Sequence, residues 1–523
     1  MRMPSRKTAL PNGHPRPHNV PDRGRRRGAS ARHRRGSSSR PSTDSAGRHP
    51  LKIIRCRLTP RTLRTTTTMA VIPVTLHRDR FDSSRVRALR RGDYLLVMDR
   101  LSGRWVAIDR PAGELLPLVG SPAHRLPEQT RGPVGRLREL LIERGIGVIG
   151  SERQFEALNT VILKLTNACN HACSYCYDYE TFERAVALSR DTAVSALQQA
   201  LDLAEQELHV ILHGGEPMLV WHLVEELVTT GRQLAAQQGK RIHFTGQTNL
   251  SRLNDAIVGF SLSNGITWGV SVDGSPDLHD HFRVDHKGRG TYVHFSRALE
   301  RYPDFVRRCG VMSTITAANQ GRLLETARHF RDLAMKSWDW SLFQPTGRGR
   351  QQQARFTLDP AVLTAAWAEL FDAVEDGEFD GFPVLPVKSY LDNFLTGPGR
   401  NMCMRPQCGA GRDLLSVSAD GSVEACDCID PTGPLSGLGS VEEGLTAARN
   451  SDAASLIRSR DLSATPCGEC IWYGVCGGTC LAHAPDLNSV SPDSCAVALC
   501  AFDKISYSLT HTPRLLDYLR TLG

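Results

Sequence analysis

Three cysteines on one short stretch, Cys169, Cys173 and Cys176, have the clearest chemical meaning in this sequence. Their CxxxCxxC spacing lets three thiolates wrap one metal cluster and leaves one metal without a protein ligand. An open metal position of this kind lets a substrate or cofactor bind the metal directly. A zinc loop is the alternative, although zinc sites commonly use CxxC pairs and no fourth ligand is evident nearby. The spacing therefore favours an iron–sulfur cluster that reacts with a bound molecule.

A second and denser group of cysteines lies in the C-terminal part of the chain. Cys408 is followed by twelve residues, Gly421, four more residues and Cys426. Two CxxC-like pairs in this region, read by themselves, suit a zinc ribbon. The large number of thiols without paired histidines favours iron–sulfur clusters instead. The other cysteines of this region are Cys403, Cys428, Cys467, Cys470, Cys476, Cys480, Cys495 and Cys500.

Alternating strand and helix patterns from residue 160 onward position the first cysteine group. Amphipathic stretches at Asp191–Gln206 and Trp221–Gln237 separate the strands. This rhythm predicts an α/β fold, a partial (β/α)6 barrel of the TIM type, whose chemistry sits at the carboxyl ends of the strands. The expected strands are Val161–Leu165, His209–His213, Arg241–Gln247, Thr267–Val272, Gly310–Thr316 and Trp338–Phe343.

Small and polar residues stand at several of these strand ends. Gly214, Gly215 and Glu216 follow the second strand, and glycines there let the backbone approach a ligand closely. Ser271 ends the fourth strand, and Arg283 follows twelve positions later. An arginine suits a carboxylate by bidentate hydrogen bonding, although a lone arginine also commonly makes a surface ion pair.

The N-terminal region divides into a basic segment and a small α+β unit. Residues 1–68 carry a net charge of +16, which leaves −7 for the rest of a chain whose total is +9. They are either a disordered tail or an untranslated stretch before Met69. Residues 69–150 predict strands at Asp93–Met98 and Arg104–Asp109 and a helix at Val134–Arg144.

Composition excludes some classes of protein. No apolar run reaches membrane-spanning length, and no secretory signal follows the basic start. Clustered cysteines in such a chain suggest metal ligands in a cytoplasmic protein rather than disulfides. A zinc-stabilised nucleic-acid-binding protein with a basic arm is a further alternative. The acidic remainder of the chain argues against it, and we expect neither a nucleic-acid nor a membrane partner.

With Tyr175 inside it, the first cysteine loop resembles the signature of radical S-adenosylmethionine (SAM) enzymes. The resemblance implies that Cys169, Cys173 and Cys176 hold a [4Fe-4S] cluster whose fourth iron binds SAM. Reductive cleavage of SAM would then yield a 5′-deoxyadenosyl radical, which abstracts a hydrogen atom from substrate. Further residues would contact SAM by the same resemblance: Tyr175, Gly214, Gly215, Glu216, Ser271 and Arg283.

The C-terminal spacing resembles the SPASM domain of peptide-modifying radical SAM enzymes, which holds two auxiliary [4Fe-4S] clusters. That makes three clusters in all. The resemblance assigns no role to Cys428, and it favours Cys500 over its rival Cys495 as the last ligand. The first auxiliary set would be Cys403, Cys408, Cys426 and Cys480, and the second Cys467, Cys470, Cys476 and Cys500.

Asp427, next to Cys426, bears on the choice of reaction. Anaerobic sulfatase-maturing enzymes share this layout and use an Asp here as the proposed base; a turn or solvent-facing Asp is the alternative. Our first hypothesis is an oxidoreductase that installs an oxidative cross-link in a ribosomally made precursor peptide. The second is a sulfatase maturase that converts Cys or Ser to formylglycine. Either would need a reducing partner such as a flavodoxin or ferredoxin.

These expectations divide the chain into six segments. The unit at 69–150 would either recognise a leader peptide through a sheet edge or cap the barrel. The segments are a basic tail (1–68), the α+β unit (69–150), the radical SAM partial barrel (151–365), a linker (366–400), the SPASM domain (401–510) and a C-terminal tail (511–523).

Overall fold

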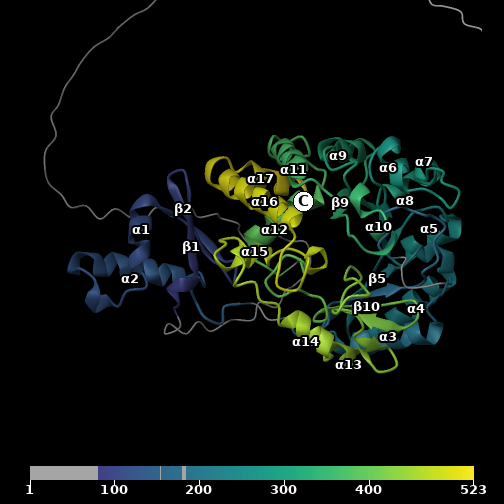
Figure 1. Cartoon of the computed structure of the whole chain (residues 1–523), viewed down its shortest axis with the longest axis horizontal. Helices are drawn as coiled ribbons and strands as arrows, with labels where there is room; N and C mark the ends of the chain where they lie inside the picture. The colour runs from purple at the N-terminus through teal and green to yellow at the C-terminus, as the bar shows by residue number, and fades with distance from the viewer. Residues whose placement is uncertain (1–80, 153–154, 179–183, 400) are drawn as a thin grey trace, which may run out of the picture. The chain divides into compact units, whose positions relative to one another are not determined.

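The computed structural model describes residues 81–152, 155–178, 184–399 and 401–523 (Figure 1). The basic segment 1–68, expected to be disordered or untranslated, lies outside the described residues. No helix in the described part of the chain is long and apolar enough to cross a membrane. The described residues build one sheet of three strands and one of nine.

The N-terminal unit is the three-stranded antiparallel sheet. Its strands β1 (Val86–Arg91), β2 (Tyr94–Asp99) and β3 (Trp105–Asp109) pair in that order, and α1 (Arg110–Leu115) and α2 (Glu128–Glu143) follow. The two expected strands are confirmed. β1 was not predicted, because half of its residues are arginine. α2 begins before the expected start at Val134, because the helix continues through Pro133.

Six parallel strands of the large sheet, β4 to β9, agree with the six that the sequence predicted. Their order in the sheet is the order along the chain, as in a curved α/β barrel segment. The strands are β4 (Thr160–Lys164), β5 (Glu207–His213), β6 (Arg241–Thr248), β7 (Thr267–Ser271), β8 (Gly310–Ile315) and β9 (Ser337–Leu342).

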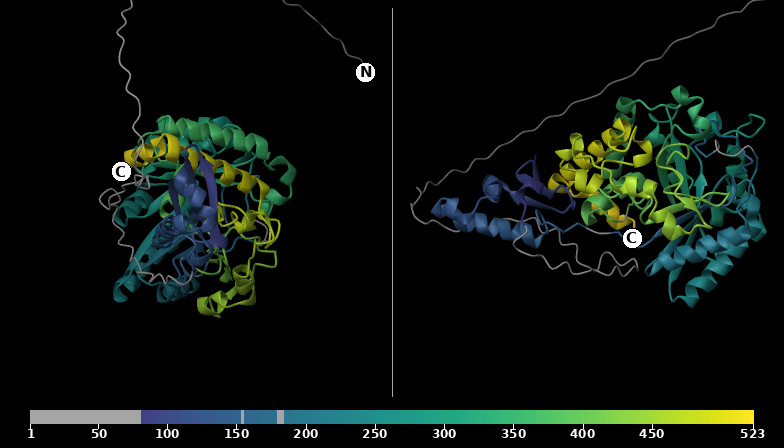
Figure 2. Two further views of the ribbon diagram at one scale, coloured as in Figure 1. Left: turned by 90° about the vertical axis from the view of Figure 1, so that its left-hand side faces the viewer. Right: turned by 60° about the horizontal axis from the view of Figure 1, so that its bottom comes forward.

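The two faces of this sheet differ in chemistry. On β5 the buried residues Leu208, Val210 and Leu212 alternate with Glu207, His209, Ile211 and His213. The apolar side packs under α3 (Arg190–Leu203) and α4 (Trp221–Gln237), which lie together against β4–β6 (Figure 2). The alternate residues therefore face the inner, concave side of the sheet.

The cysteine-rich segment continues the same sheet, which the sequence did not predict. β10 (Leu414–Val417) pairs parallel with β4, and β11 (Ser422–Glu424) and β12 (Gly439–Ser440) extend it antiparallel. This pairing brings the segment that carries Cys426 and Asp427 beside the carboxyl end of β4.

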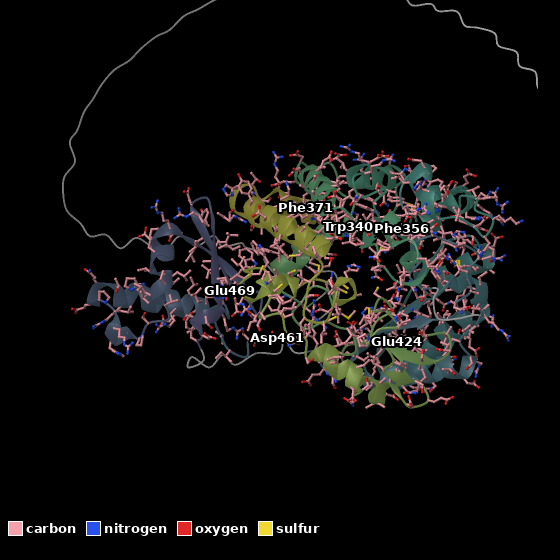
Figure 3. All side chains as sticks on the ribbon, viewed as in Figure 1. Trp340, Phe356, Phe371, Glu424, Asp461 and Glu469 are labelled. Carbon is pink, nitrogen blue, oxygen red and sulfur yellow. The ribbon has the colours of Figure 1, made fainter. Side chains whose placement is uncertain are left out.

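Residues 366–400, expected to be a linker, are helical and buried. They contain the end of α11 (Pro360–Glu375) and all of α12 (Leu385–Thr396). On α11, the rings of Phe371 and Trp367 meet edge to face, and Trp367 also contacts Trp340 of β9 (Figure 3). The linker assignment is therefore wrong, because the apolar faces of both helices complete the core.

The end of the chain is likewise part of the fold. α16 (Pro492–His511) packs on α11, and residues 511–523, expected to be a tail, form α17 (Arg514–Thr521) with Leu515 and Tyr518 buried. The other α-helices are α5 (Asp255–Ser263), α6 (Pro276–Phe282), α7 (Tyr292–Arg301), α8 (Pro303–Val306), α9 (Leu323–Asp332), α10 (Gly347–Arg350), α13 (Leu445–Arg449), α14 (Asp452–Arg458) and α15 (Tyr473–Cys476). Single 3-10 turns are η1 (Ser83–Arg85), η2 (Leu116–Leu118), η3 (Ala123–Arg125), η4 (Pro217–Val220), η5 (Gln353–Arg355), η6 (Pro466–Gly468) and η7 (Leu481–His483).

Candidate active site

The loop after β4 carries the first cysteine group and is fixed by backbone hydrogen bonds on two sides. Gly215 N donates to Thr166 O at 2.6 Å, which ties the loop to the end of β5. Ala172 N donates to Val284 O at 2.7 Å, which ties it to the segment after α6. Hydrogen bonds to the end of β5 and to the segment after α6 thus fix the conformation of the loop.

The three thiols of this loop suit a metal cluster. Burial raises the pKa of Cys173 and Cys176, and for Cys176 the nearby Cys173 raises it further. Grouped, partly buried thiolates need a cation to compensate their charge. Polar N–H groups point at the sulfur of Cys169, from His171 N at 3.4 Å and from Asn249 Nδ2 at 3.8 Å. Such hydrogen bonds are typical around iron–sulfur clusters.

The two positions after β5 must be glycine, because their backbone lies directly against the backbone of the cysteine loop. Gly214 has φ +119°, and a Cβ there would lie 2.3 Å from Thr166 O. A Cβ on Gly215 would lie 2.1 Å from Ala168 O. Only glycine lets the β5 end approach the cysteine loop this closely.

Glu216 is buried, and its carboxylate joins two strand ends. It accepts hydrogen bonds from Thr248 Oγ1 at 2.7 Å, Asn249 N at 2.8 Å and Met218 N at 3.1 Å. Burial raises its pKa to about 7. Both carboxylate oxygens of Glu216 are thus engaged at the end of β6 and on η4, and its expected contact with SAM stays a prediction.

Ser271, at the end of β7, forms a hydrogen bond with a side chain of β6. Gln247 Nε2 donates to Ser271 Oγ at 2.7 Å. Gly269 makes room for this contact, since a Cβ there would lie 2.2 Å from Gln247 Oε1. Ser271 therefore has a fixed position beside the ends of β6 and β8.

Arg283 and Tyr175 meet at Asp273, which sequence reasoning did not single out. Arg283 Nε lies 3.0 Å from Asp273 Oδ1, and the Tyr175 hydroxyl donates to Asp273 Oδ2. The guanidinium also sits 5.4 Å from the centre of the Tyr175 ring. Thr314 N donates to Asp273 Oδ1 at 3.0 Å. Arg283 is thus held in a buried ion pair rather than on the surface.

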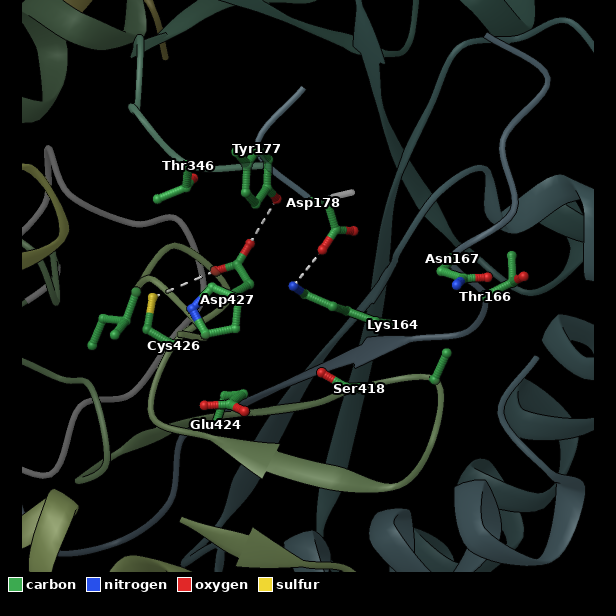
Figure 4. A pocket seen from close by; sticks show the side chains of 13 residues that line it. Lys164, Thr166, Asn167, Tyr177, Asp178, Thr346, Ser418, Glu424, Cys426 and Asp427 are labelled. Carbon is green, nitrogen blue, oxygen red and sulfur yellow. Dashed lines mark hydrogen bonds and ion pairs between the residues drawn. The ribbon is translucent and has the colours of Figure 1, made fainter. Parts of the chain in front are cut away.

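A pocket lies between the end of β4, the cysteine loop and the segment that follows β11 (Figure 4). Lys164 Nζ pairs with Asp178 Oδ1 at 2.6 Å. Across the pocket, the Tyr177 hydroxyl donates to Asp427 Oδ2 at 3.1 Å, and the Cys426 thiol lies 3.4 Å from Asp427 Oδ1. Asp427 therefore lies on a turn, is partly buried and lines the pocket.

Charged neighbours keep Asp427 ionised. Burial opposes its charge, but His213 and Lys164 hold its pKa below the usual value. Lys164 in turn has its pKa raised to about 12, because Asp178 and Asp427 outweigh the effect of burial. The pocket therefore presents a carboxylate that can accept a proton or a hydrogen bond.

The first C-terminal cysteine set converges beside this pocket. Hydrogen bonding with Cys480 and burial raise the pKa of Cys403, and Cys408 and Cys428 contribute to that increase. Hydrogen bonding with Cys428 and burial raise the pKa of Cys426, and the nearby Cys403 contributes to that increase. The structure therefore groups the four expected cysteines and adds Cys428, whose thiol lies within 4.8 Å of that of Cys426.

Of the two candidates for the last ligand of the second C-terminal set, Cys495 lies nearer to the other thiols. The thiol of Cys495 interacts electrostatically with Cys467 and Cys470, and Cys476 interacts with Cys470 and Cys495. Five residues along a helix correspond to a rotation of about 140°, so Cys495 and Cys500 face different sides of α16. Cys500 instead neighbours Lys504, Asp503 and Asp372. The choice of Cys500 as the last ligand is therefore not supported by the structure.

Comparison with known families identifies the barrel. Residues 163–329 match the model of the radical SAM superfamily, and this span contains the cysteine loop and the strand ends described above. The barrel is a radical SAM domain. The resemblance noted from the cysteine spacing and the strand-end residues is thereby confirmed.

Proteins similar to this chain include several maturases. The cysteine-type anaerobic sulfatase-maturating enzyme of Clostridium perfringens (strain 13 / Type A) is 22% identical over 339 residues, 62% of this chain and 88% of the relative. The mycofactocin maturase MftC of Mycobacterium ulcerans (strain Agy99) is 26% identical over 331 residues, 61% and 82% of the two chains. The solved structure of native anSMEcpe with bound AdoMet has a TM-score of 0.60 at 20% identity, covering 70% of this chain and 100% of the other. These likenesses support the radical SAM α/β fold.

Three residues of the radical SAM pocket were missed in the sequence: Lys164, Tyr177 and Asp178. One signal was available, because Lys164 is a charged residue that ends an otherwise apolar strand. Tyr177 and Asp178 directly follow Cys176, and only the fold of the loop shows that Tyr177 turns toward Asp427 and Asp178 toward Lys164 (Figure 4).

Proposed function

We propose that the enzyme abstracts a hydrogen atom from a side chain of a ribosomally made precursor peptide and installs an oxidative cross-link. The observation that carries this proposal is the pocket in which Asp427 lies between the cysteine loop and the first C-terminal cysteine set. A radical site, a base and an electron acceptor would then border one substrate position. Loss of two hydrogens from the peptide is the expected chemical outcome.

The cysteines would hold three [4Fe-4S] clusters. Cys169, Cys173 and Cys176 would hold the cluster that binds SAM; together they supply the 5′-deoxyadenosyl radical that removes the hydrogen atom. Arg283, Tyr175, Ser271 and the glycine pair would form the walls of the SAM site. The auxiliary sets would be Cys403, Cys408, Cys426 and Cys480, and Cys467, Cys470, Cys476 and Cys495.

Asp427 would accept the proton that leaves the substrate side chain. Its ionised state suits this task, and the Tyr177 hydroxyl fixes the direction of the carboxylate. Lys164 and Asp178 would border the same side chain. The electron left on the substrate would pass to the auxiliary sites, and a flavodoxin or ferredoxin in the cytoplasm would supply the reducing electron for SAM cleavage.

The N-terminal unit would recognise the leader of the precursor peptide through the edge of β3. The two edges of its sheet are β1 and β3. β1 is rich in arginine, and its Arg87 and Arg91 pair with Glu469 and Asp503. Charged edge strands resist added strands, whereas the apolar edge β3 can accept one.

A co-expression experiment tests the proposed reaction. A short peptide encoded beside the gene is produced with the enzyme under anaerobic conditions and analysed by mass spectrometry. We expect a loss of two hydrogens that fragmentation assigns to two linked residues. The Cys169→Ala variant is the control and should leave the peptide unchanged; a peptide unmodified by the active enzyme would refute the proposal.

A sulfatase maturase that forms formylglycine is the second candidate, and Asp427 favours it. Its position after Cys426 in the pocket fits the base of such an enzyme, and several relatives bear the name anaerobic sulfatase-maturating enzyme. Incubation with peptides that contain a sulfatase-type Cys or Ser distinguishes the two. Aldehyde formation there, with no cross-link in the adjacent peptide, would replace the first candidate by the second.

A further inference from the structure

Two histidines and a glutamate gather on the inner face of the large sheet, at the end of the strands opposite to the pocket. Glu207 and His209 lie two residues apart on β5, so they share a face. His243 on β6 is the direct register partner of His209. Because the two strands are paired in the middle of a nine-stranded sheet, their backbone fixes the three positions.

The side chains approach one another closely enough to share a metal ion. Their candidate ligand atoms all lie within 4.8 Å of one another. His243 Nε2 is 3.5 Å from Glu207 Oε2, near the separation of about 3.3 Å that two ligands have around a tetrahedral zinc with bonds of about 2.0 Å. The two imidazole rings stack with centroids 4.8 Å apart. Small rotations of the side chains would bring all the ligand atoms from within 4.8 Å to the separation that a bound zinc requires.

The local charges suit a cation that is open to solvent. Glu207 supplies the one carboxylate of the group, and imidazoles such as those of His209 and His243 bind metal in their neutral form. Glu207 is 24% exposed and His243 47% exposed, so an ion can reach them. Arg241 Nη2 pairs with Glu207 Oε2 at 3.1 Å and would compete with the ion for this carboxylate.

We propose that Glu207, His209 and His243 bind one zinc-class divalent ion, and that the guanidinium of Arg241 competes with this ion for the carboxylate of Glu207. Two imidazoles and one carboxylate favour Zn²⁺ and similar transition metals over Mg²⁺ or Ca²⁺, which prefer oxygen ligands. Three protein ligands leave the fourth position to water. The ion links β5 to β6 on the concave face.

This site is separate from the radical chemistry. Four residues along β5 separate His209 from His213, which corresponds to about 13 Å of strand. The ion therefore does not touch the pocket or the cysteine loop. We expect its binding to raise the thermal unfolding temperature and to leave the rate of SAM cleavage unchanged.

The test is a zinc titration of the full, cluster-loaded chain against a chromophoric chelator, under anaerobic conditions with a non-thiol reductant. Iron is counted in the same samples. The wild type should take up one equivalent of zinc without losing iron, and His209→Ala and His243→Ala should each lose that equivalent. The Arg241→Ala variant loses the ion pair with Glu207, so its carboxylate is released for zinc. Zinc affinity should then rise about fivefold, which corresponds to the loss of an exposed ion pair of about 1 kcal/mol.

His222→Ala is the matched control, because His222 is exposed on the neighbouring helix α4. It should keep the zinc equivalent. The proposal is overturned if His209→Ala and His243→Ala both retain zinc binding, or if zinc uptake is matched by an equal loss of iron in every variant. Because His243 is half-exposed, its replacement leaves the core intact, and unchanged cluster absorption verifies that the variant is folded.

Discussion

The hydroxyl of Tyr177 donates a hydrogen bond to the carboxylate of Asp427, although 250 residues separate them in the sequence. Tyr177 belongs to the cysteine loop, and Asp427 belongs to the segment that extends the barrel sheet through β10 and β11. This bond joins the radical SAM site to the first C-terminal cysteine set. The parallel pairing of β10 with β4 is what brings the two side chains into reach.

Replacement of Tyr177 by Phe should slow product formation and spare SAM cleavage. Hydrogen bonds to charged groups contribute about 1.5–3 kcal/mol, so we expect a decrease of about 10- to 100-fold in peptide turnover. The phenyl ring keeps the packing beside Lys164. Single-turnover assays that quantify 5′-deoxyadenosine and modified peptide separately measure the effect. Tyr507→Phe, at an exposed tyrosine, is the control and should be silent.

Replacement of Lys164 by Met should move the acid side of the pH–activity profile to higher pH. His213 and Lys164 keep the pKa of Asp427 below its usual value, so loss of one cation raises that pKa. A base works only when ionised, and activity therefore falls as the pH drops through this pKa. Peptide turnover measured between pH 5 and 8 provides the profile. Lys164→Arg keeps the charge and should keep the wild-type profile; identical profiles for the Met and Arg variants would contradict the assignment.

The two cysteines of α16 should differ in their effect on iron content. Cys495→Ser removes a thiol that lies with Cys467 and Cys470, whereas Cys500→Ser removes one beside Lys504. We expect Cys495→Ser to lower iron and sulfide by about one cluster and Cys500→Ser to retain both. Iron and sulfide analysis with electron paramagnetic resonance measures this directly. The reverse result would restore Cys500 as the ligand.

Gly215→Ala should disrupt the cysteine loop. An added Cβ would lie 2.1 Å from Ala168 O, which is backbone and cannot rotate away. Overpacking of this kind costs about 1–3 kcal/mol, and here it also displaces the thiols. Loss of the first cluster, seen as reduced iron and absent SAM cleavage, is expected. Gly259→Ala serves as the control, since a Cβ there meets nothing within 4 Å; equal behaviour of the two variants would refute the steric argument.

The sequence predicted the six parallel strands and the cysteine loop because both depend on local patterns. Apolar strands alternate with amphipathic helices, and the three thiols lie within eight residues. β10 escaped prediction because it is a strand of four residues whose partner, β4, is distant in sequence. The helix α12 was taken for a linker because its apolar residues serve a core that only the assembled fold provides.

The site was predicted less completely than the fold. Glycines and cysteines reveal themselves by spacing, but ion pairs such as Lys164 with Asp178 depend on how a loop turns back on a strand. The choice between Cys495 and Cys500 likewise depends on the rotation of α16, which spacing from the previous cysteine does not specify. The role of Asp273 was hidden because its contacts with Tyr175, Arg283 and Thr314 N form only when the strands of the barrel assemble.

Asp273→Asn should weaken SAM binding and lower stability together. The change keeps the size of the side chain and its contact with Thr314 N but removes the charge opposite Arg283. Arg283 is buried, and breaking a buried ion pair by removing one partner costs about 3–5 kcal/mol. We expect a lower unfolding temperature and a SAM dissociation constant raised at least tenfold, measured by calorimetry on the cluster-loaded enzyme. Asp277→Asn removes an exposed pair with Arg322 and should change both quantities little, because exposed ion pairs contribute about 0–1 kcal/mol. If Asp273→Asn binds SAM as tightly as Asp277→Asn does, then Arg283 keeps its position without Asp273, and the ion pair serves the fold alone.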